Sequence, residues 1–163
     1  MKTLEDLYFK ELRDLYGSEK LLERALPRIM QSADSTDLRE ALTNHLRETR
    51  GHVSRLERIF QMHGKQPSIK YSKALEGILR EAEEDIADET HPAWRDAAIV
   101  AAVQQIEHYE MAAYATLQTY ALHLGHEEAG KILLATLAEA RAEDRKLTEI
   151  VHNHLRVNPS RAA

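Results

Sequence analysis

Cysteine is absent from the 163 residues of the sequence. Its absence excludes disulfide bonds, thiolate catalysis and zinc sites that depend on cysteine ligands. The sequence also has only six glycines and four prolines, so few positions can interrupt a helix. Basic residues are not in excess, since the formal net charge is −5, and we therefore do not expect nucleic acid as a partner.

Long apolar runs are missing as well. The first ten residues contain Glu5, Asp6 and Lys10 and lack the apolar stretch of a signal peptide, and no later run has the length of a membrane span. We expect a cytoplasmic protein with no membrane partner. Its length and its 43% hydrophobic and 30% charged residues fit one globular domain, which we place at 1–156, followed by a flexible C-terminal tail at 157–163.

Apolar residues recur at steps of three and four over most of the chain, which is the pattern of amphipathic helices. Gly64 and Gly125 mark helix ends, and Pro27 should kink its helix or end the regular hydrogen bonding near Glu23. We predict long helices over 4–33, 36–63, 93–124 and 126–153, and a shorter helix over 72–89.

The shorter helix lies in a long connection, residues 64–92, between two helical hairpins. A connection of that length can run along a whole bundle, and ferritin-like folds contain one such crossover. The sequence therefore predicts an all-α protein, a ferritin-like antiparallel four-helix bundle with a short extra helix in the crossover. The crossover could cover its own bundle or a partner subunit.

Acidic and imidazole side chains interrupt the apolar stripes at one level of each hairpin. At a rise of ~1.5 Å per residue, Glu19 and Glu48 both lie roughly 20 Å from the turn that joins their helices. Glu110 and Glu139 lie at roughly the same distance from the turn at Gly125. The polar residues on these stripes are Glu19, His45, Glu48, His52, Glu107, Glu110, Glu139 and Glu143.

Several ionised carboxylates buried together are costly, at roughly several kcal/mol per ion. Bound cations would supply the missing positive charge, and an oxygen-rich site with one or two imidazoles suits iron or manganese. The ferritin-like pattern for two metal ions is a Glu from each of two helices and a Glu-x-x-His from each of the other two. The stripes therefore favour a site for two metal ions.

Each of these residues also has a simpler interpretation. A single Glu on a helix is usually solvated, and His45 and His52 could be half-buried core residues. Glu107 and Glu110 would form an exposed patch if the third long helix were rotated. Tyr114, near the same level, could donate a hydrogen bond to a ligand or simply fill the core. The matched level in both hairpins is what favours the metal site.

Six short motifs spread over the chain resemble one known family. They are LEDL at 4–7, YGSEK at 16–20, HLRET at 45–49, GHV at 51–53, EHYE at 107–110 and DRKLT at 144–148. Together they resemble the YciF-like proteins, a bacterial branch of the ferritin-like superfamily related to the rubrerythrins. The resemblance implies a protein associated with stress response, typically a homodimer, whose activity is not firmly assigned.

The resemblance also implies roles for the predicted ligands. Glu48 and Glu139 match the bridging carboxylates of the second and fourth helices. The terminal positions fall on Glu19, His52, Glu107, Glu110 and Glu143. A strict Glu-x-x-His would require histidine at Gly51 and Ala142, so His52 or His45 would have to serve in the second helix and Glu143 in the fourth.

Two hypotheses about function follow. The first is a metal-binding protein with two iron ions, or manganese in their place, whose oxidase-like or peroxidase-like chemistry acts on oxygen or peroxide in stress response or iron handling. Its predicted metal residues are Glu19, Glu48, His52, Glu107, Glu110, Glu139 and Glu143. The alternative is a structural or interaction bundle that keeps the fold without a working metal site. A calcium site is less expected, because the ligands lie on rigid helices and not in a loop.

Overall fold

The computed structural model describes residues 2–157, with side chains as far as residue 153. Every element in this part of the chain is a helix. The helices are α1 (Leu4–Ser32), α2 (Thr36–Met62), α3 (Lys73–Asp88), α4 (Pro92–His123) and α5 (Glu127–Val157). The prediction of four long helices and one short helix is confirmed. The predicted tail at 157–163 lies, beyond Val157, outside the described residues.

The helix ends follow from local chemistry. The Thr3 hydroxyl accepts a hydrogen bond from the Asp6 backbone N–H, and the Asp6 carboxylate accepts one from the Thr3 backbone N–H, which closes a capping box at the start of α1. Gly64 and Gly125 adopt left-handed φ angles of 63° and 75° beyond α2 and α4, where glycine has no Cβ to clash. α1 continues through Pro27 to Ser32, because the loss of one N–H donor is outweighed by the packing of the buried residues around it.

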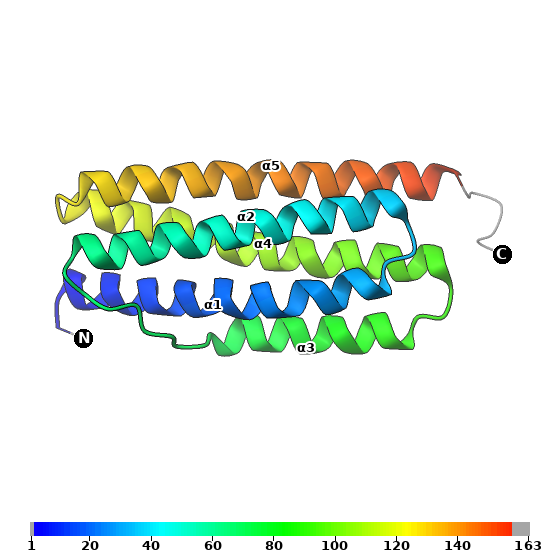
Figure 1. The fold of residues 1–163 in the computed structure, drawn as a ribbon, viewed down its shortest axis with the longest axis horizontal. Coiled ribbons are helices and arrows are strands. Elements are labelled where there is room, and N and C mark those ends of the chain that lie inside the picture. Colours follow the sequence, from blue (N-terminus) through cyan, green and yellow to red (C-terminus); the bar gives the residue numbers. More distant parts are fainter. Residues whose placement is uncertain (1, 158–163) are drawn as a thin grey trace.

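The helices form two antiparallel hairpins, α1–α2 and α4–α5 (Figure 1). After α2 the chain returns along the bundle through α3 to the end at which α4 begins, so α1 starts and α5 ends at opposite ends of the molecule. α3 packs against α1 and α4 of its own chain. The crossover therefore covers its own bundle, which answers the question that the sequence left open. No helix within residues 2–157 is both long enough and apolar enough to cross a membrane.

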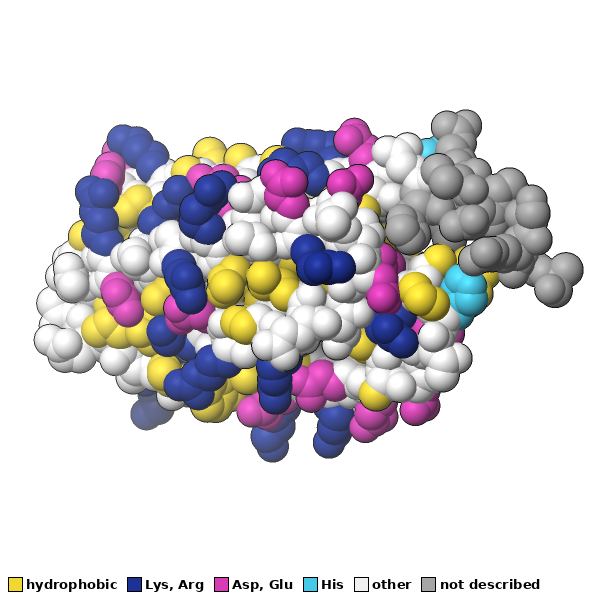
Figure 2. All heavy atoms as spheres, turned by 45° about the vertical axis from the view of Figure 1, so that its right-hand side comes forward, with side chains coloured by type: hydrophobic (Ala, Val, Ile, Leu, Met, Phe, Trp, Pro, Cys, Tyr) yellow, Lys and Arg dark blue, Asp and Glu magenta, His cyan; other side chains and the backbone are white. Residues whose placement is uncertain are grey.

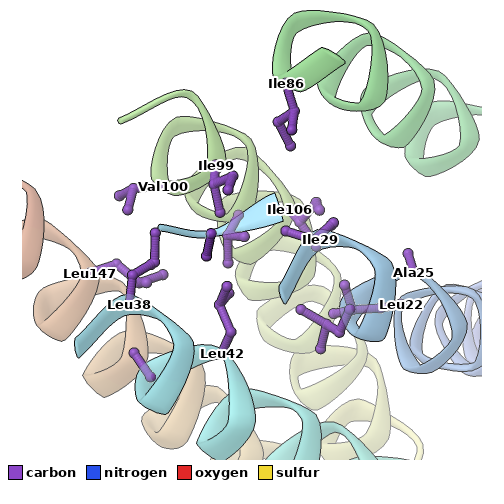
Figure 3. Packing of buried hydrophobic residues seen from close by; sticks show 14 of the residues in the cluster. Leu22, Ala25, Ile29, Leu38, Leu42, Ile86, Ile99, Val100, Ile106 and Leu147 are labelled. Atoms are coloured by element: carbon purple, nitrogen blue, oxygen red, sulfur yellow. The ribbon is translucent and has the colours of Figure 1, made fainter. Parts of the chain in front are cut away.

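The interior consists of two apolar clusters placed one after the other along the bundle. One contains residues such as Leu22, Leu42, Ile106 and Leu147, whose side chains point toward one another from four helices (Figure 3). The other contains aromatic and aliphatic residues from the opposite half: Tyr8, Leu12, Leu56, Phe60, Tyr114 and Leu117 among others. On every long helix the two clusters are separated by polar residues, and these form a layer across the bundle.

A buried carboxylate ties the hairpins together at one end. Asp96, near the start of α4, accepts hydrogen bonds of 2.8 Å from the backbone N–H groups of Asp34 and Ser35 in the α1–α2 turn. On the face of the molecule in Figure 2, acidic and basic side chains are interspersed over the helices. Charge on this face is thus mixed, as expected of a solvated helix surface.

Gly17 is the point of closest approach between α1 and the crossover. A Cβ atom at this position would lie 2.3 Å from the backbone oxygen of Lys70. Lys70 also pairs with Asp14 one turn earlier, at 3.0 Å between Nζ and Oδ1. The absence of a side chain at Gly17 therefore lets the crossover lie directly on α1.

We expect Gly17→Ala to lower the free energy of unfolding by about 1–3 kcal/mol, because the added methyl group has to push the backbone at Lys70 away. Gly77→Ala is the matched control, since Gly77 also lies in a helix and a Cβ there meets no atom within 4 Å. The control should gain about 0.5–1 kcal/mol from helix propensity. Urea unfolding followed by circular dichroism measures both, and a gain in both variants would refute the close approach.

Candidate metal centre

The polar layer between the two apolar clusters is almost completely buried. Its side chains come from all four long helices, and none of the buried members is more than 5% exposed. They are Glu19 on α1, His45, Thr49 and His52 on α2, Glu107 and Glu110 on α4, and Glu143 on α5. The layer exists because each residue replaces one apolar position of a helix stripe that is otherwise buried.

His45, Glu107 and Glu110 form the tightest group in the layer. One ligand atom from each can be chosen so that all three lie within 4.8 Å of one another. His45 Nε2 lies 3.0 Å from Glu107 Oε1. One imidazole and two carboxylates at this spacing could hold a divalent ion such as iron or manganese.

Glu19 is fully buried and held by two partners. The Tyr114 hydroxyl donates a hydrogen bond to Glu19 Oε1, and His52 Nδ1 lies 3.2 Å from the same oxygen. Tyr114 therefore fills the core and also donates a hydrogen bond, so it combines the two roles that the sequence presented as alternatives. The hydroxyl fixes one oxygen of the carboxylate and leaves the other, Oε2, without a partner.

Glu143 and Glu48 lie on the side of the layer where α2 faces α5. Lys146, one turn along α5, donates a hydrogen bond of 3.1 Å to Glu143 Oε2. Glu48 is only half-buried. Burial and, after it, the charge of Glu143 raise the pKa of Glu48 above its usual value, which places the two carboxylates within electrostatic reach of each other.

Glu139 differs from the other predicted ligands in its environment. Its side chain is 37% exposed, and Arg55 forms a two-pronged ion pair with it, with both N–O distances at 2.8 Å. His52 Nε2 lies 3.1 Å from Glu139 Oε2. The hydrogen bond from Arg55, together with that from His52, keeps the pKa of Glu139 below its usual value even though burial opposes the shift.

The electrostatics of the layer are those of excess negative charge. Burial, together with the charges of Glu19 and Glu107, raises the pKa of Glu110 well above the usual value for a carboxyl group. Burial alone would lower the pKa of His45, but its hydrogen bond to Glu107 and the neighbouring carboxylates outweigh it and raise the pKa. The pKa of His52 is raised in the same way by Glu19 and Glu139. The imidazoles thus act as partial counter-charges.

Buried polar atoms without a hydrogen-bond partner indicate whether metal ions fit this layer. Among the described residues, buried atoms without a hydrogen-bond partner include one from each of five members of the layer: Glu19 Oε2, His45 Nδ1, Thr49 Oγ1, Glu110 Oε1 and Glu143 Oε1. Buried polar atoms are nearly always satisfied, so a group of this kind needs an explanation. Carboxylate oxygens are ligands for the metals named above, and their unused lone pairs fit metal ions.

Several members of the layer were not among the predicted metal residues. The sequence presents His45 only as a substitute for His52, yet both are buried in the layer. Thr49 in the layer and Arg55 beside it were missed, although each follows one of these histidines at helical spacing on α2. That spacing was the available signal, but a neutral hydroxyl and a guanidinium do not stand out in a search for ligands.

Comparisons with known proteins define the class first. The chain is similar to part of a two-domain protein from Anabaena variabilis that contains dj-1/thij/pfpi-like and ferritin-like domains. The match has a TM-score of 0.65 at 12% identity, and it covers 99% of this chain and 40% of that one. Together with the helix order and the crossover, this makes the protein a ferritin-like four-helix bundle, as the sequence predicted.

The family follows from closer relatives. Residues 3–158 match the family described as Domain of unknown function (DUF892), and the chain belongs to that family. Protein YciF of Escherichia coli (strain K12) is 40% identical over 157 residues, which is 95% of this chain and 94% of that protein. The predicted YciF-like membership is confirmed.

Two solved structures are similar over nearly the whole chain. The crystal structure of the E. coli stress protein YciF has a TM-score of 0.91 at 38% identity, covering 96% of this chain and 99% of that one. YcfI from Rhodopseudomonas palustris has a TM-score of 0.88 at 39% identity, covering 90% and 94%. These relatives therefore share the complete bundle and not only one hairpin.

We expect the metal-free protein to lose stability as the pH rises above 6.5. The raised pKa values of His45 and His52 mean that their protonated forms stabilise the fold fully below the unfolded value of 6.5, and that this contribution is lost as the pH passes their folded values. The raised pKa of Glu110 acts in the same direction. Urea unfolding between pH 6 and 9 measures the effect, and a flat profile would contradict it.

Proposed function

We propose that the protein is a ferritin-like metal-binding protein whose polar layer holds two iron ions, with manganese as the other candidate metal. One observation carries the proposal: buried oxygen and nitrogen atoms from all four long helices converge in one layer and lack hydrogen-bond partners. Two divalent ions would supply the positive charge and use those lone pairs. The match to ferritin-like structures supports the same reading.

The residues that would hold the ions divide by position. His45, Glu107 and Glu110 form the compact group for one ion. A second ion would be held by Glu19, through its unpaired oxygen, and by Glu143. On α2, His52 and Glu48 would add the remaining ligands of that second ion. This set keeps six of the predicted metal residues and adds His45, while Glu139 is left out because it is partly exposed and paired with Arg55.

When bound, two ferrous ions can supply the two electrons that reduce one hydrogen peroxide, with two protons, to two water molecules. The chain's own residues prepare the site for such chemistry. The two apolar clusters above and below the layer exclude water from it. Tyr114 holds Glu19 in place through its hydrogen bond. The half-buried Glu48 lies where the layer meets solvent. A function in peroxide or oxygen removal, or in iron handling, is consistent with this arrangement.

The biological setting is proposed from the relatives. The E. coli relative is described as a stress protein, which supports a part in stress response for this chain. We also propose a cytoplasmic homodimer. The surface of α4 supports the dimer, because beyond Asp96 it presents no acidic side chain to solvent: Glu107 and Glu110 are the acidic residues there, and both are buried. Light scattering of the purified protein should give twice the mass of one chain.

The alternative is a structural or interaction bundle without a working metal site. The basic side chains of the protein favour this alternative, since they already pair with carboxylates in and beside the layer. These side chains are His45, His52 and Arg55. The histidines that a strict Glu-x-x-His would need are replaced by Gly51 and Ala142. The R. palustris relative carries a provisional description as a structural protein, which points the same way.

Metal analysis of protein purified without an affinity tag separates the two functions. We expect close to two iron or manganese ions per chain. Glu110→Gln should abolish most of the uptake and at the same time raise the stability of the chelator-treated protein, because it removes a buried carboxylate that lies near Glu19 and Glu107. The stability gain should be on the order of 1–3 kcal/mol.

Glu149→Gln is the control, since Glu149 lies on the exposed surface of α5 and should leave both quantities unchanged. Wild-type protein that contains no metal, and takes up neither ferrous iron nor manganese, would refute the proposal and favour the structural bundle. Uptake that Glu110→Gln leaves unchanged would remove Glu110 from the ligand set.

A further inference from the structure

The carboxylate of Glu139 is the one predicted bridging ligand whose oxygens are both engaged by protein groups. Oε1 accepts a hydrogen bond from one arm of the Arg55 guanidinium, and Oε2 accepts one from the other arm and lies 3.1 Å from His52 Nε2. By contrast, Glu19, Glu110 and Glu143 each have one buried oxygen without a partner. The free lone pairs that a metal ion would use are on those three residues.

We propose that Glu139 and Arg55 are positioning residues, which orient the His52 ring toward the metal ions, and that Glu139 is not itself a bridging ligand. This inference rests on the proposed function, because it assigns an outer role around the same metal site. It departs from the pattern that the family resemblance implies for the fourth helix.

The ring of His52 explains why such a pair is needed. An imidazole has two nitrogens, and the group that binds one of them determines the direction of the other. Here Nε2 faces Glu139, and Nδ1 faces the buried Glu19 at 3.2 Å. Nδ1 is therefore the nitrogen directed into the layer. Metal-binding histidines commonly donate their second ring N–H to a carboxylate in this way, which fixes the ring and increases its basicity.

Arg55 fixes the position of the Glu139 carboxylate, which in turn contacts the His52 ring. It follows His52 by three residues on α2, so both side chains face α5 from the same side of the helix. Its guanidinium also donates a hydrogen bond of 3.2 Å to Thr136 Oγ1, one turn before Glu139 on α5. The fork geometry of a guanidinium restrains both carboxylate oxygens at once, which a single ammonium group could not do.

Anaerobic titration of the full-length protein with Co²⁺ tests the inference, because both the number of ions bound and the visible absorption bands report on the ligands. The variants are Glu139→Ala, which removes the acceptor for His52, and Glu139→Gln, which keeps an acceptor oxygen. Glu128→Ala is the matched control, because Glu128 forms an exposed ion pair with Arg58 between the same two helices. Circular dichroism of each variant confirms that the helices are retained.

We expect Glu139→Ala to bind Co²⁺ about 10–100-fold more weakly, with the same number of ions per chain and the same band positions as the wild type. Glu139→Gln should recover part of the affinity, and the Glu128→Ala control should bind as the wild type does. Loss of an ion from Glu139→Ala would show that Glu139 is a ligand after all, and unchanged affinity would show that it has no role; either result overturns the inference. Wild-type protein that binds no Co²⁺ would instead overturn the proposed function, and this inference with it.

Discussion

The cost of burying like charges governs this structure. Glu19, Glu107, Glu110 and Glu143 are each no more than 2% exposed and lie between two apolar clusters. An ionised carboxylate in such surroundings costs roughly several kcal/mol unless it is paired. Apolar residues of similar volume often stabilise a protein as well as buried charged groups or better, so we expect the layer to lower the stability of the bundle. Such a loss of stability is typical of functional sites, where a residue serves a ligand and not the fold.

The protein offsets only part of this cost by itself. His45 and His52 lie against Glu107 and Glu19, and Lys146 reaches Glu143 from the surface. The raised pKa of Glu110 indicates that this compensation is incomplete, because burial and the charges of Glu19 and Glu107 together still disfavour its ionised form. Proposed metal ions would therefore complete an arrangement that the side chains begin.

The two hairpins are equivalent in spacing but not in chemistry. Helical periodicity and counted distances from the turns were sufficient to place Glu19, Glu107, Glu110 and Glu143 on buried stripes at one level, because rise and period are fixed by backbone geometry. The same arithmetic placed Glu48 and Glu139 beside them, yet both are partly exposed. A small rotation of a helix decides whether a residue at the edge of the stripe faces the layer or solvent, and only the packing of neighbouring helices determines it.

Side-chain partners were beyond what spacing could predict. The Arg55–Glu139 pair depends on the distance between α2 and α5 and on two side-chain conformations. The approach of the crossover to Gly17 depends on contacts between residues far apart in the chain. The continuity of α1 through Pro27 shows that a proline need not end a helix whose flanking residues are buried.

The buried Asp96 carboxylate has a consequence for how the chain assembles. It accepts hydrogen bonds from two backbone N–H groups in the turn between α1 and α2, yet it lies 61 residues after Ser35. At about 5–20 residues per second, a ribosome takes on the order of 3–12 seconds to synthesise that interval. Until Asp96 has been synthesised, the backbone N–H groups of Asp34 and Ser35 lack this acceptor. Completion of the turn therefore coincides with docking of the second hairpin, which makes the two halves of the bundle depend on each other in folding.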